Sequence, residues 1–449
     1  MSALQSWHRG RARVGERLPI IKNETLTYLS KRLGGYGFAS VVETAGAFVI
    51  SVALGRLCGS EILGDYVFAQ GLGLLVSLLL GLGVNHSLLV QVARGDGDRG
   101  VLLRRSIRLT MVLQLLSAVV ILGLIWLFVG GGEDQRHTYL FGLLPCLTSC
   151  SAVLFAYGAG CDQLKPYISL RVGTGLLRIS WLLVLAFNGG AALDFARVLV
   201  CVEALVIAVG WLAIWRHHPA GLRGPWRFQS DDIPWLKASA HLGISQFIGQ
   251  VTLRVDAVMI RLLMTREAAG LYGAARTLAA APRVLENALL LAMTPKQGQA
   301  ASRGGMALWK LTRRILTYLV FVTALEILIL GVLAPYLMIW IYGSGYTDSV
   351  LPMRLLLFAL PLTGSAIILR SAAYCADRAP AVTRIAVIVG LANILGNGVL
   401  IPLWGLHGAV AASLASLALW AWGLARVVSE PLSTPAAPLA EESDAGNLS

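Results

Sequence analysis

The sequence predicts an all-α polytopic membrane protein, and three observations support this fold class. Of the 449 residues, 56% are hydrophobic and only 14% are charged, whereas a soluble domain carries about 25% charge. The mean hydropathy of the chain is +0.70. Apolar segments of about 20 residues, the length that crosses a bilayer, recur about twelve times along the chain.

The predicted spans follow one another with short loops between them. They lie near 36–57, 64–88, 107–129, 138–158, 167–187, 194–215, 238–263, 270–294, 312–334, 352–374, 381–402 and 406–428. Residues 1–35 are predicted to form a basic cytoplasmic segment without a cleaved signal peptide. Residues 429–449 are rich in Pro, Ala and Ser, which predicts a disordered cytoplasmic tail.

Lys and Arg gather in alternate loops, which predicts the orientation of the chain. One set of loops holds most of the basic residues, and the other set holds little beyond Arg136 and Arg266. The basic loops are expected on the cytoplasmic side, together with both termini. The sequence shows no nucleic-acid-binding motif, so the net charge of +13 does not indicate a nucleic-acid partner.

A repeated motif predicts two equivalent halves. Glu61-x-x-Gly64-x-Tyr66-x-x-Ala69 matches Glu267-x-x-Gly270-x-Tyr272-x-x-Ala275, and each copy follows the first span of a six-span half. Because six is an even number, the halves share one orientation, which predicts parallel lobes with a site between them. The predicted lobes are 36–215 and 238–428, joined by a cytoplasmic linker at 216–237.

Arginines inside the apolar spans predict a basic lining for an anionic cargo. An ionisable side chain in a membrane span is expected to face a protein interior or a watery cavity. Arg254/Arg261 and Arg276/Arg283 are seven residues apart, about two helical turns, and Arg171/Arg178 repeat this spacing. The candidate substrate-binding residues are Arg178, Arg254, Arg276, Arg283 and Arg370. The alternative is that each arginine pairs with a carboxylate and only holds helices together.

Carboxylates in the spans are candidates for ion coupling or for neutralising these arginines. Glu43 and Asp256 are the candidate coupling residues, with H⁺ or Na⁺ as the coupling ion, because burial favours a protonated carboxyl group. Asp256 cannot face Arg254 on one regular helix, so it is expected to pair across helices. Glu203 is a further buried carboxylate, and Glu286 can bond Arg283 within one helix.

The motifs resemble those of the Wzx-like, or PST-type, oligosaccharide flippases of the MATE-related flippase superfamily. The similar features are Gly64-x-Tyr66, Arg254-x-Asp256 in the seventh span and Gly270-Leu-Tyr272-x-Ala-Ala entering the eighth. The resemblance covers roughly residues 23–428. It implies two six-helix lobes around a central cationic cavity, and transport of a lipid-linked oligosaccharide on undecaprenyl pyrophosphate for cell-surface polysaccharide synthesis. The two further spans of lipid II flippases are not found here.

Other functions are weaker predictions. A multidrug cation antiporter of the same fold is the main alternative, but its pocket would be acidic and aromatic rather than basic. A membrane polymerase or glycosyltransferase would need clustered catalytic groups and a large loop, so we expect no enzyme activity. The six cysteines form no C-x-x-C pair and no Walker motif is present, so we expect no metal and no cofactor.

Overall fold

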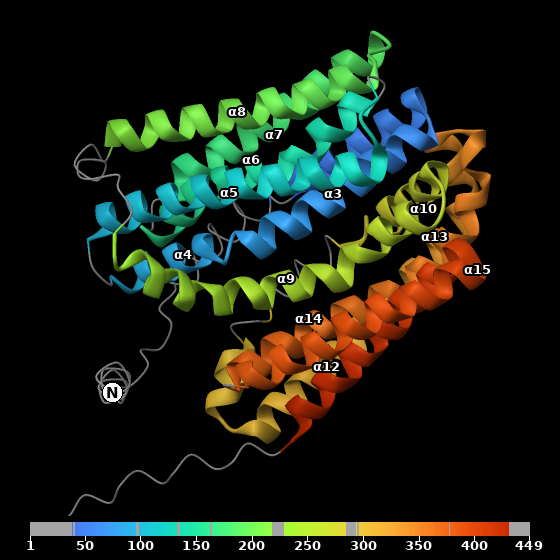
Figure 1. The fold of residues 1–449 in the computed structure, drawn as a ribbon. Coiled ribbons are helices and arrows are strands. Elements are labelled where there is room, and N and C mark those ends of the chain that lie inside the picture. The colour runs from blue at the N-terminus through green and yellow to red at the C-terminus, as the bar shows by residue number, and fades with distance from the viewer. Residues whose placement is uncertain are drawn as a thin grey trace, which may run out of the picture.

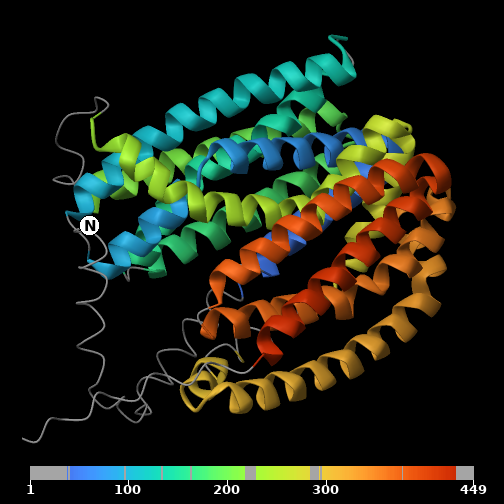
Figure 2. The ribbon, with the colours of Figure 1, turned by 60° about the horizontal axis from the view of Figure 1, so that its bottom comes forward.

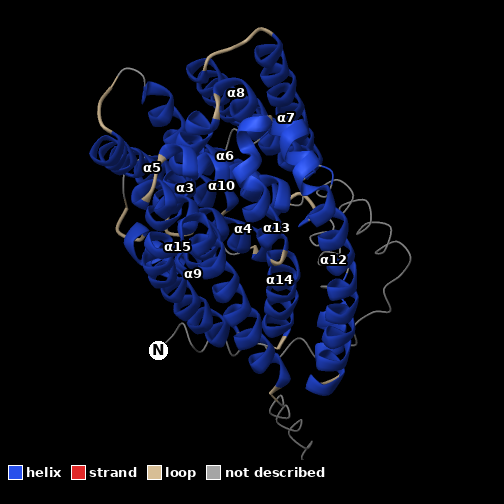
Figure 3. Cartoon of the chain, turned by 90° about the vertical axis from the view of Figure 1, so that its right-hand side faces the viewer, coloured by secondary structure: helices blue, strands red, loops and turns tan. Residues whose placement is uncertain are grey.

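The computed structural model describes residues 38, 41–95, 98–132, 135–161, 164–217, 229–283, 293, 296–376 and 378–430. The predicted N-terminal segment, residues 431–449 of the predicted tail and residues 218–228 of the predicted linker lie outside the described residues. The described residues form helices and short connections without any strand, which confirms the predicted all-α class (Figure 3). Nine of the described helical stretches are long and apolar enough to cross a membrane.

The first half of the chain forms seven helical elements. The first span is Val41–Cys58, and its last turn is the π-helix η1 (Leu54–Cys58). It is followed by α3 (Ser60–Leu80), α4 (Val84–Arg94), α5 (Arg99–Val129), α6 (Arg136–Gly160), α7 (Leu164–Phe187) and α8 (Ala192–His217). Side-chain caps fix some of these starts, since Asp98 accepts hydrogen bonds from the backbone N–H groups of Gly100 and Val101.

The second half begins with α9 (Asp232–Leu263) and α10 (Arg266–Ala279). Thr265 caps α10 by accepting from the Ala268 N–H group. After a short helix over 296–302 come α12 (Gly305–Tyr342), η4 (Ser344–Ser349), α13 (Val350–Leu357), α14 (Ala359–Cys375) and α15 (Ala379–Ser429).

Several of the predicted spans coincide with single helices, and four places differ. The tenth predicted span, 352–374, is divided between α13 and α14, and α10 of the eighth, 270–294, ends at Ala279. The second predicted span is divided into α3 and α4 by a turn in which Leu82 (φ 47°) and Gly83 (φ 69°) are left-handed. The 51 residues of α15 are broken at Gly405 (φ 57°, ψ −133°), so α15 turns back on itself and supplies the last two predicted spans (Figure 2).

The helices form two groups, and α9 lies between them. Residues 41–217 make one bundle and residues 305–430 make the other, with α9 running along the boundary (Figure 1). α9 packs against α3 and α4 of the first bundle and against α15 of the second. Its first turn is held by Asp232, which is fully buried and forms ion pairs with Arg105 and Arg108 of α5.

The two copies of the repeated motif pack directly against each other where α3 crosses α10. A Cβ atom on Gly64 would lie 1.9 Å from the carbonyl oxygen of Arg266, and one on Gly270 would lie 1.8 Å from that of Ser60. Each glycine therefore faces the backbone four residues before the other glycine. This reciprocal contact is what a two-fold relation between the halves requires.

An ion cluster at the same crossing joins the halves, and we call it the latch. Asp65 of α3 is fully buried and binds Arg266 of α10, with Nε–Oδ2 at 3.1 Å, and Arg261 of α9, with Nε–Oδ1 at 3.4 Å. His137 Nε2 of α6 lies 3.5 Å from Asp65 Oδ2.

Other contacts between the bundles also lie at the latch end. The Tyr346 hydroxyl donates to the Gly55 carbonyl at 3.0 Å, and the hydroxyl groups of Ser51 and Tyr342 are 2.9 Å apart. Arg56 Nη1 donates to the carbonyl oxygen of Trp340 at 2.6 Å. These hydrogen bonds between 41–217 and 305–430 hold the bundles together at this end.

Candidate functional site

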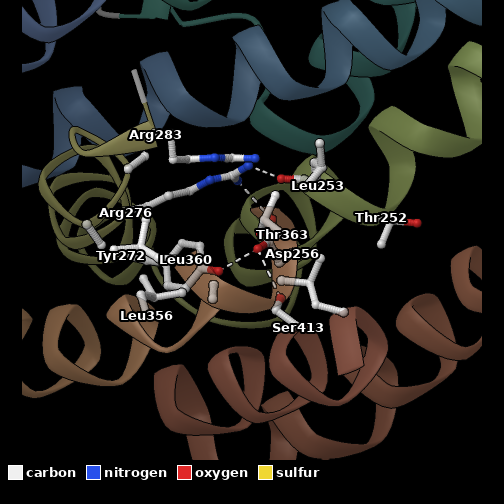
Figure 4. A pocket seen from close by; sticks show the side chains of 14 residues that line it. Thr252, Leu253, Asp256, Tyr272, Arg276, Arg283, Leu356, Leu360, Thr363 and Ser413 are labelled. Carbon is white, nitrogen blue, oxygen red and sulfur yellow. Dashed lines mark hydrogen bonds and ion pairs between the residues drawn. The ribbon is translucent and has the colours of Figure 1, made fainter. Parts of the chain in front are cut away.

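A small pocket beside α9 contains three of the predicted site residues. Asp256 of α9 is at its centre, with Arg276 of α10 and Arg283, which follows α10, beside it (Figure 4). The pocket encloses about 60 Å³, and α13, α14 and α15 complete its walls. Figure 4 shows Arg276 and Arg283 both extending from the α10 side toward Leu253 of α9.

Asp256 organises this pocket through several hydrogen bonds. The Tyr272 hydroxyl donates to Asp256 Oδ2, and Ser413 Oγ of α15 donates to the same oxygen at 3.2 Å. Arg276 Nη1 binds Asp256 Oδ1 at 3.0 Å, and Arg276 Nη2 donates to the Leu253 carbonyl. Asp256 thus pairs across helices, as predicted, and it fixes the direction of the Arg276 guanidinium group.

Arg254 differs from its neighbours because it has no such partner. Its side chain is exposed in the middle of α9, and it forms no hydrogen bond or ion pair with another described residue. It is within electrostatic range of Arg276 and Arg283, and also of Asp256 and of Tyr66 on α3. The positive charge of Arg254 is therefore not neutralised by a contacting carboxylate among the described residues.

Arg178 extends this basic region into the first bundle. It acts electrostatically on Tyr66, as Arg254 does, so Tyr66 is within electrostatic range of one arginine from each half. Arg178 Nη2 is 3.5 Å from Glu203 Oε1 on α8. We call Arg178, Arg254, Arg276 and Arg283 the basic cluster.

Two other predicted residues lie outside the basic cluster. Glu43 of the first span accepts a two-pronged interaction from Arg171 of α7, with Arg171 Nη2 at 2.6 Å from Glu43 Oε2. Arg370 of α14 is 5.8 Å from the ring centroid of Trp420 and lines neither this pocket nor the second pocket, described below. Glu286, the predicted intrahelical partner of Arg283, lies outside the described residues.

Two features of the structure were not anticipated from the sequence. Asp65 directly follows Gly64 in the first copy of the repeated motif, whereas Leu271 follows Gly270 in the second copy. This difference between the copies was a signal for the latch. The break at Gly81–Gly83 was a signal for a second pocket between α3 and α4. Among the described residues, no group of three or more His, Cys, Asp and Glu side chains could hold a metal ion.

Comparison with known proteins identifies the family of the chain. Residues 35–297 match the family described as polysaccharide biosynthesis protein, and because this match covers more than half of the chain, the chain belongs to that family. The predicted resemblance to polysaccharide flippases is thereby confirmed at the level of the family. No curated protein matched the chain in a sequence search.

Solved structures of three transporters share the fold. An inward-facing multidrug resistance MATE family transporter of the MOP superfamily aligns with a TM-score of 0.68 at 13% identity, covering 88% of this chain and 98% of the other. An outward-facing multidrug resistance MATE family transporter of the MOP superfamily aligns with a TM-score of 0.62 at 13% identity, covering 89% of this chain and 95% of the other. The lipid II flippase MurJ in an inward closed conformation aligns with a TM-score of 0.64 at 16% identity, covering 86% and 85%. The chain is therefore a multi-pass membrane protein with the two-lobe fold of these transporters.

Proposed function

We propose that this chain moves a lipid-linked oligosaccharide, carried on undecaprenyl pyrophosphate, across the bacterial inner membrane for cell-surface polysaccharide synthesis. The observation that carries this proposal is Arg254, an arginine in the middle of a membrane bundle that no described carboxylate contacts. The family to which the chain belongs and its transporter fold support the same role.

The chemistry of the basic cluster suits a diphosphate. A guanidinium group is permanently charged and presents donors in a fork that matches phosphate oxygens. Asp256 contacts Arg276 and Glu203 contacts Arg178, whereas no described carboxylate contacts Arg254. The diphosphate or acidic sugars would therefore supply the missing negative charge, while the lipid tail stays in the bilayer.

The arrangement of contacts suggests which side is open. The latch end carries the sparsely charged loops, and the opposite end carries the basic loops that are expected in the cytoplasm. Because the described hydrogen bonds between the bundles lie at the latch end, we infer that the basic cluster is reached from the cytoplasmic side. Transport by alternating access would then require the latch to separate while the opposite end closes.

A multidrug cation antiporter is the second candidate, because transporters of that kind share the fold. The charge of the site argues against it. A cationic drug would have to approach Arg254, which no described carboxylate contacts, and Arg276, whose charge is already paired with Asp256. Repulsion between like charges makes such a site unfavourable for cations.

Glu43 and Asp256 remain our candidates for coupling transport to H⁺ or Na⁺. Each would have to exchange an arginine for the ion, since Arg171 binds Glu43 and Arg276 binds Asp256. In Glu43→Gln, transport driven by an imposed proton or sodium gradient should fall to the rate without a gradient. An unchanged response to both gradients would remove Glu43 from this role.

Translocation in proteoliposomes tests the proposal. Fluorescent undecaprenyl-pyrophosphate oligosaccharide would be supplied on one leaflet, and its arrival on the other measured by accessibility to an added enzyme. We expect Arg254→Ala to slow translocation by about 10- to 100-fold, the cost of losing hydrogen bonds to a charged group. Arg254→Lys should keep part of the rate, because it keeps the charge and loses the fork.

Arg197→Ala is the matched control. Arg197 is a mostly exposed arginine at the latch end that pairs with Asp194 three residues away. Its removal should leave translocation unchanged. Equal rates for wild type, Arg254→Ala and Arg197→Ala would contradict the proposal, and so would export of cationic drugs without any transport of the lipid-linked sugar.

A further inference from the structure

A second pocket lies in the first bundle, on the far side of the basic cluster from the latch. It encloses about 320 Å³ at the break between α3 and α4, and α5, α6 and α9 complete its walls. None of its lining residues is Asp, Glu, Lys or Arg, and its polar groups are hydroxyl, amide and imidazole groups. We call it the uncharged pocket.

Two polar atoms at this pocket lack partners. Thr110 of α5 is 4% exposed, and its Oγ1 makes no hydrogen bond with the described residues. Asn85 of α4 donates through Nδ2 to the Ser149 carbonyl at 3.1 Å, but its Oδ1 is buried without a partner. A buried polar atom left without a hydrogen bond costs free energy. Both residues line the pocket, so a rotation of either side chain would offer its covered oxygen to a polar molecule that enters the pocket.

The neighbouring polar groups are already fixed in place. Gln114 lies one turn from Thr110, accepts from Ser77 Oγ at 2.7 Å and donates to the Ser77 carbonyl at 3.2 Å. His86 of α4 is hydrogen-bonded to Gln246 of α9, with a shortest N–N distance of 2.6 Å. Such preorganised groups lose little conformational entropy when a ligand binds.

The backbone break that forms the pocket is tightly packed. A Cβ atom on Gly83 would lie 2.5 Å from the backbone nitrogen of Gly243 on α9. Leu82 beside it has a positive φ of 47°, which is unfavourable for a side chain of this size. Interrupted spans in transporters commonly form binding sites, and strained backbone concentrates at such sites.

We propose that the uncharged pocket binds an uncharged sugar residue of the transported oligosaccharide, and this inference rests on the proposed function. Hydroxyl and amide groups match the donors and acceptors of a sugar ring. A sugar carboxylate would be buried there without a counter-charge, which is strongly unfavourable. Hard cations prefer carboxylate ligands, and the pocket offers none.

α9 connects the two sites. Gln246 lines the uncharged pocket and Arg254 belongs to the basic cluster, eight residues further on, which corresponds to roughly 12 Å along the helix. A diphosphate at the basic cluster would therefore leave the attached glycan within reach of the uncharged pocket. The charged and uncharged parts of one molecule would be recognised by separate parts of the protein.

Binding of free sugars to the purified full-length protein in nanodiscs tests this inference. The probes are glucose, galactose, N-acetylglucosamine and glucuronate, and saturation-transfer NMR detects their binding. Inorganic pyrophosphate is a separate probe of the basic cluster. At least one neutral sugar should bind, and glucuronate should not. Thr110→Val should weaken neutral-sugar binding by about three- to tenfold, the effect of one lost hydrogen bond. Ala152→Leu, which fills the pocket, should abolish it.

Two controls separate binding from folding. Thr312→Val on α12 removes another fully buried hydroxyl without a partner, at a residue that lines neither pocket, and should leave sugar binding unchanged. Pyrophosphate binding should survive Thr110→Val and Ala152→Leu. The inference is overturned if no neutral sugar binds, or if Thr110→Val and Thr312→Val have equal effects. If the wild-type protein does not bind pyrophosphate, the proposed function is contradicted instead.

Discussion

Arg261 and Arg254 lie on the same helix, two turns apart, and have opposite environments. Arg261 is 15% exposed, lies 3.4 Å from the buried carboxylate of Asp65 and is 5.8 Å from the ring centroid of Phe68. Arg254 is exposed and contacts no described carboxylate. The first arginine belongs to the latch that joins the halves, and the second is available for a ligand. The presence of a carboxylate on the neighbouring helix, rather than the spacing along α9, makes this difference.

The latch side of this comparison gives the largest expected effect on stability. In Asp65→Asn, Arg261 would lose the one described carboxylate that it contacts, and Arg266 would keep only its ion pair with the exposed Glu61, at 3.5 Å. Removing one partner of a buried ion pair costs about 3–5 kcal/mol, so the free energy of unfolding should fall by about that amount. Unfolding by SDS in mixed micelles measures it. The control is Asp194→Asn, which removes an exposed pair with Arg197 and should cost less than about 1 kcal/mol.

If the two aspartate variants lose equal stability, the latch is not a structural ion cluster. A spin-label distance across the latch end gives a second measurement. Asp65→Asn should broaden or lengthen the distance between labels on α3 and α10, because the attraction between the halves is reduced. A wild-type distance distribution in Asp65→Asn would contradict this expectation.

The crossing of the two motif copies predicts the next largest effect. In Gly64→Ala the added methyl group would meet the Arg266 carbonyl oxygen, so α3 and α10 would have to move apart. Overpacking of this kind costs about 1–3 kcal/mol. Gly123→Ala in α5, where nothing lies within 4 Å of the new Cβ atom, is the matched control. Gly123→Ala should be neutral or slightly stabilising in the same unfolding experiment. If Gly64→Ala and Gly123→Ala lower the free energy of unfolding equally, α3 and α10 do not pack closely at Gly64.

The smallest expected effect concerns the pair of Arg171 and Glu43. Their side chains are 38% and 40% exposed, so their attraction is screened and Arg171→Ala should change the free energy of unfolding by less than about 1 kcal/mol. A loss as large as that of Asp65→Asn would mean that this pair is a second latch. In that case the latch could not be distinguished from other arginine–carboxylate pairs by how much stability it contributes.

The sequence predicted the spans and the repeat well, because hydropathy and motif spacing are local properties. It also predicted that Asp256 pairs across helices. It could not predict that Arg261 is neutralised and Arg254 is not, since Asp65 is 196 residues from Arg261 in the sequence. The same reason applies to Glu203, whose pairing with Arg178 depends on how α7 packs against α8. The uncharged pocket was missed because it is built from hydroxyl and amide groups on five helices.

The binding of inorganic pyrophosphate to Arg254→Ala and Arg261→Ala tests the central claim most directly. Titration calorimetry on each purified protein in nanodiscs would give the dissociation constants. We expect Arg254→Ala to bind pyrophosphate about 10- to 100-fold more weakly than wild type with unchanged stability, and Arg261→Ala to keep the affinity while losing stability. Wild-type affinity in Arg254→Ala, or an equal loss of affinity in both variants, would contradict the account.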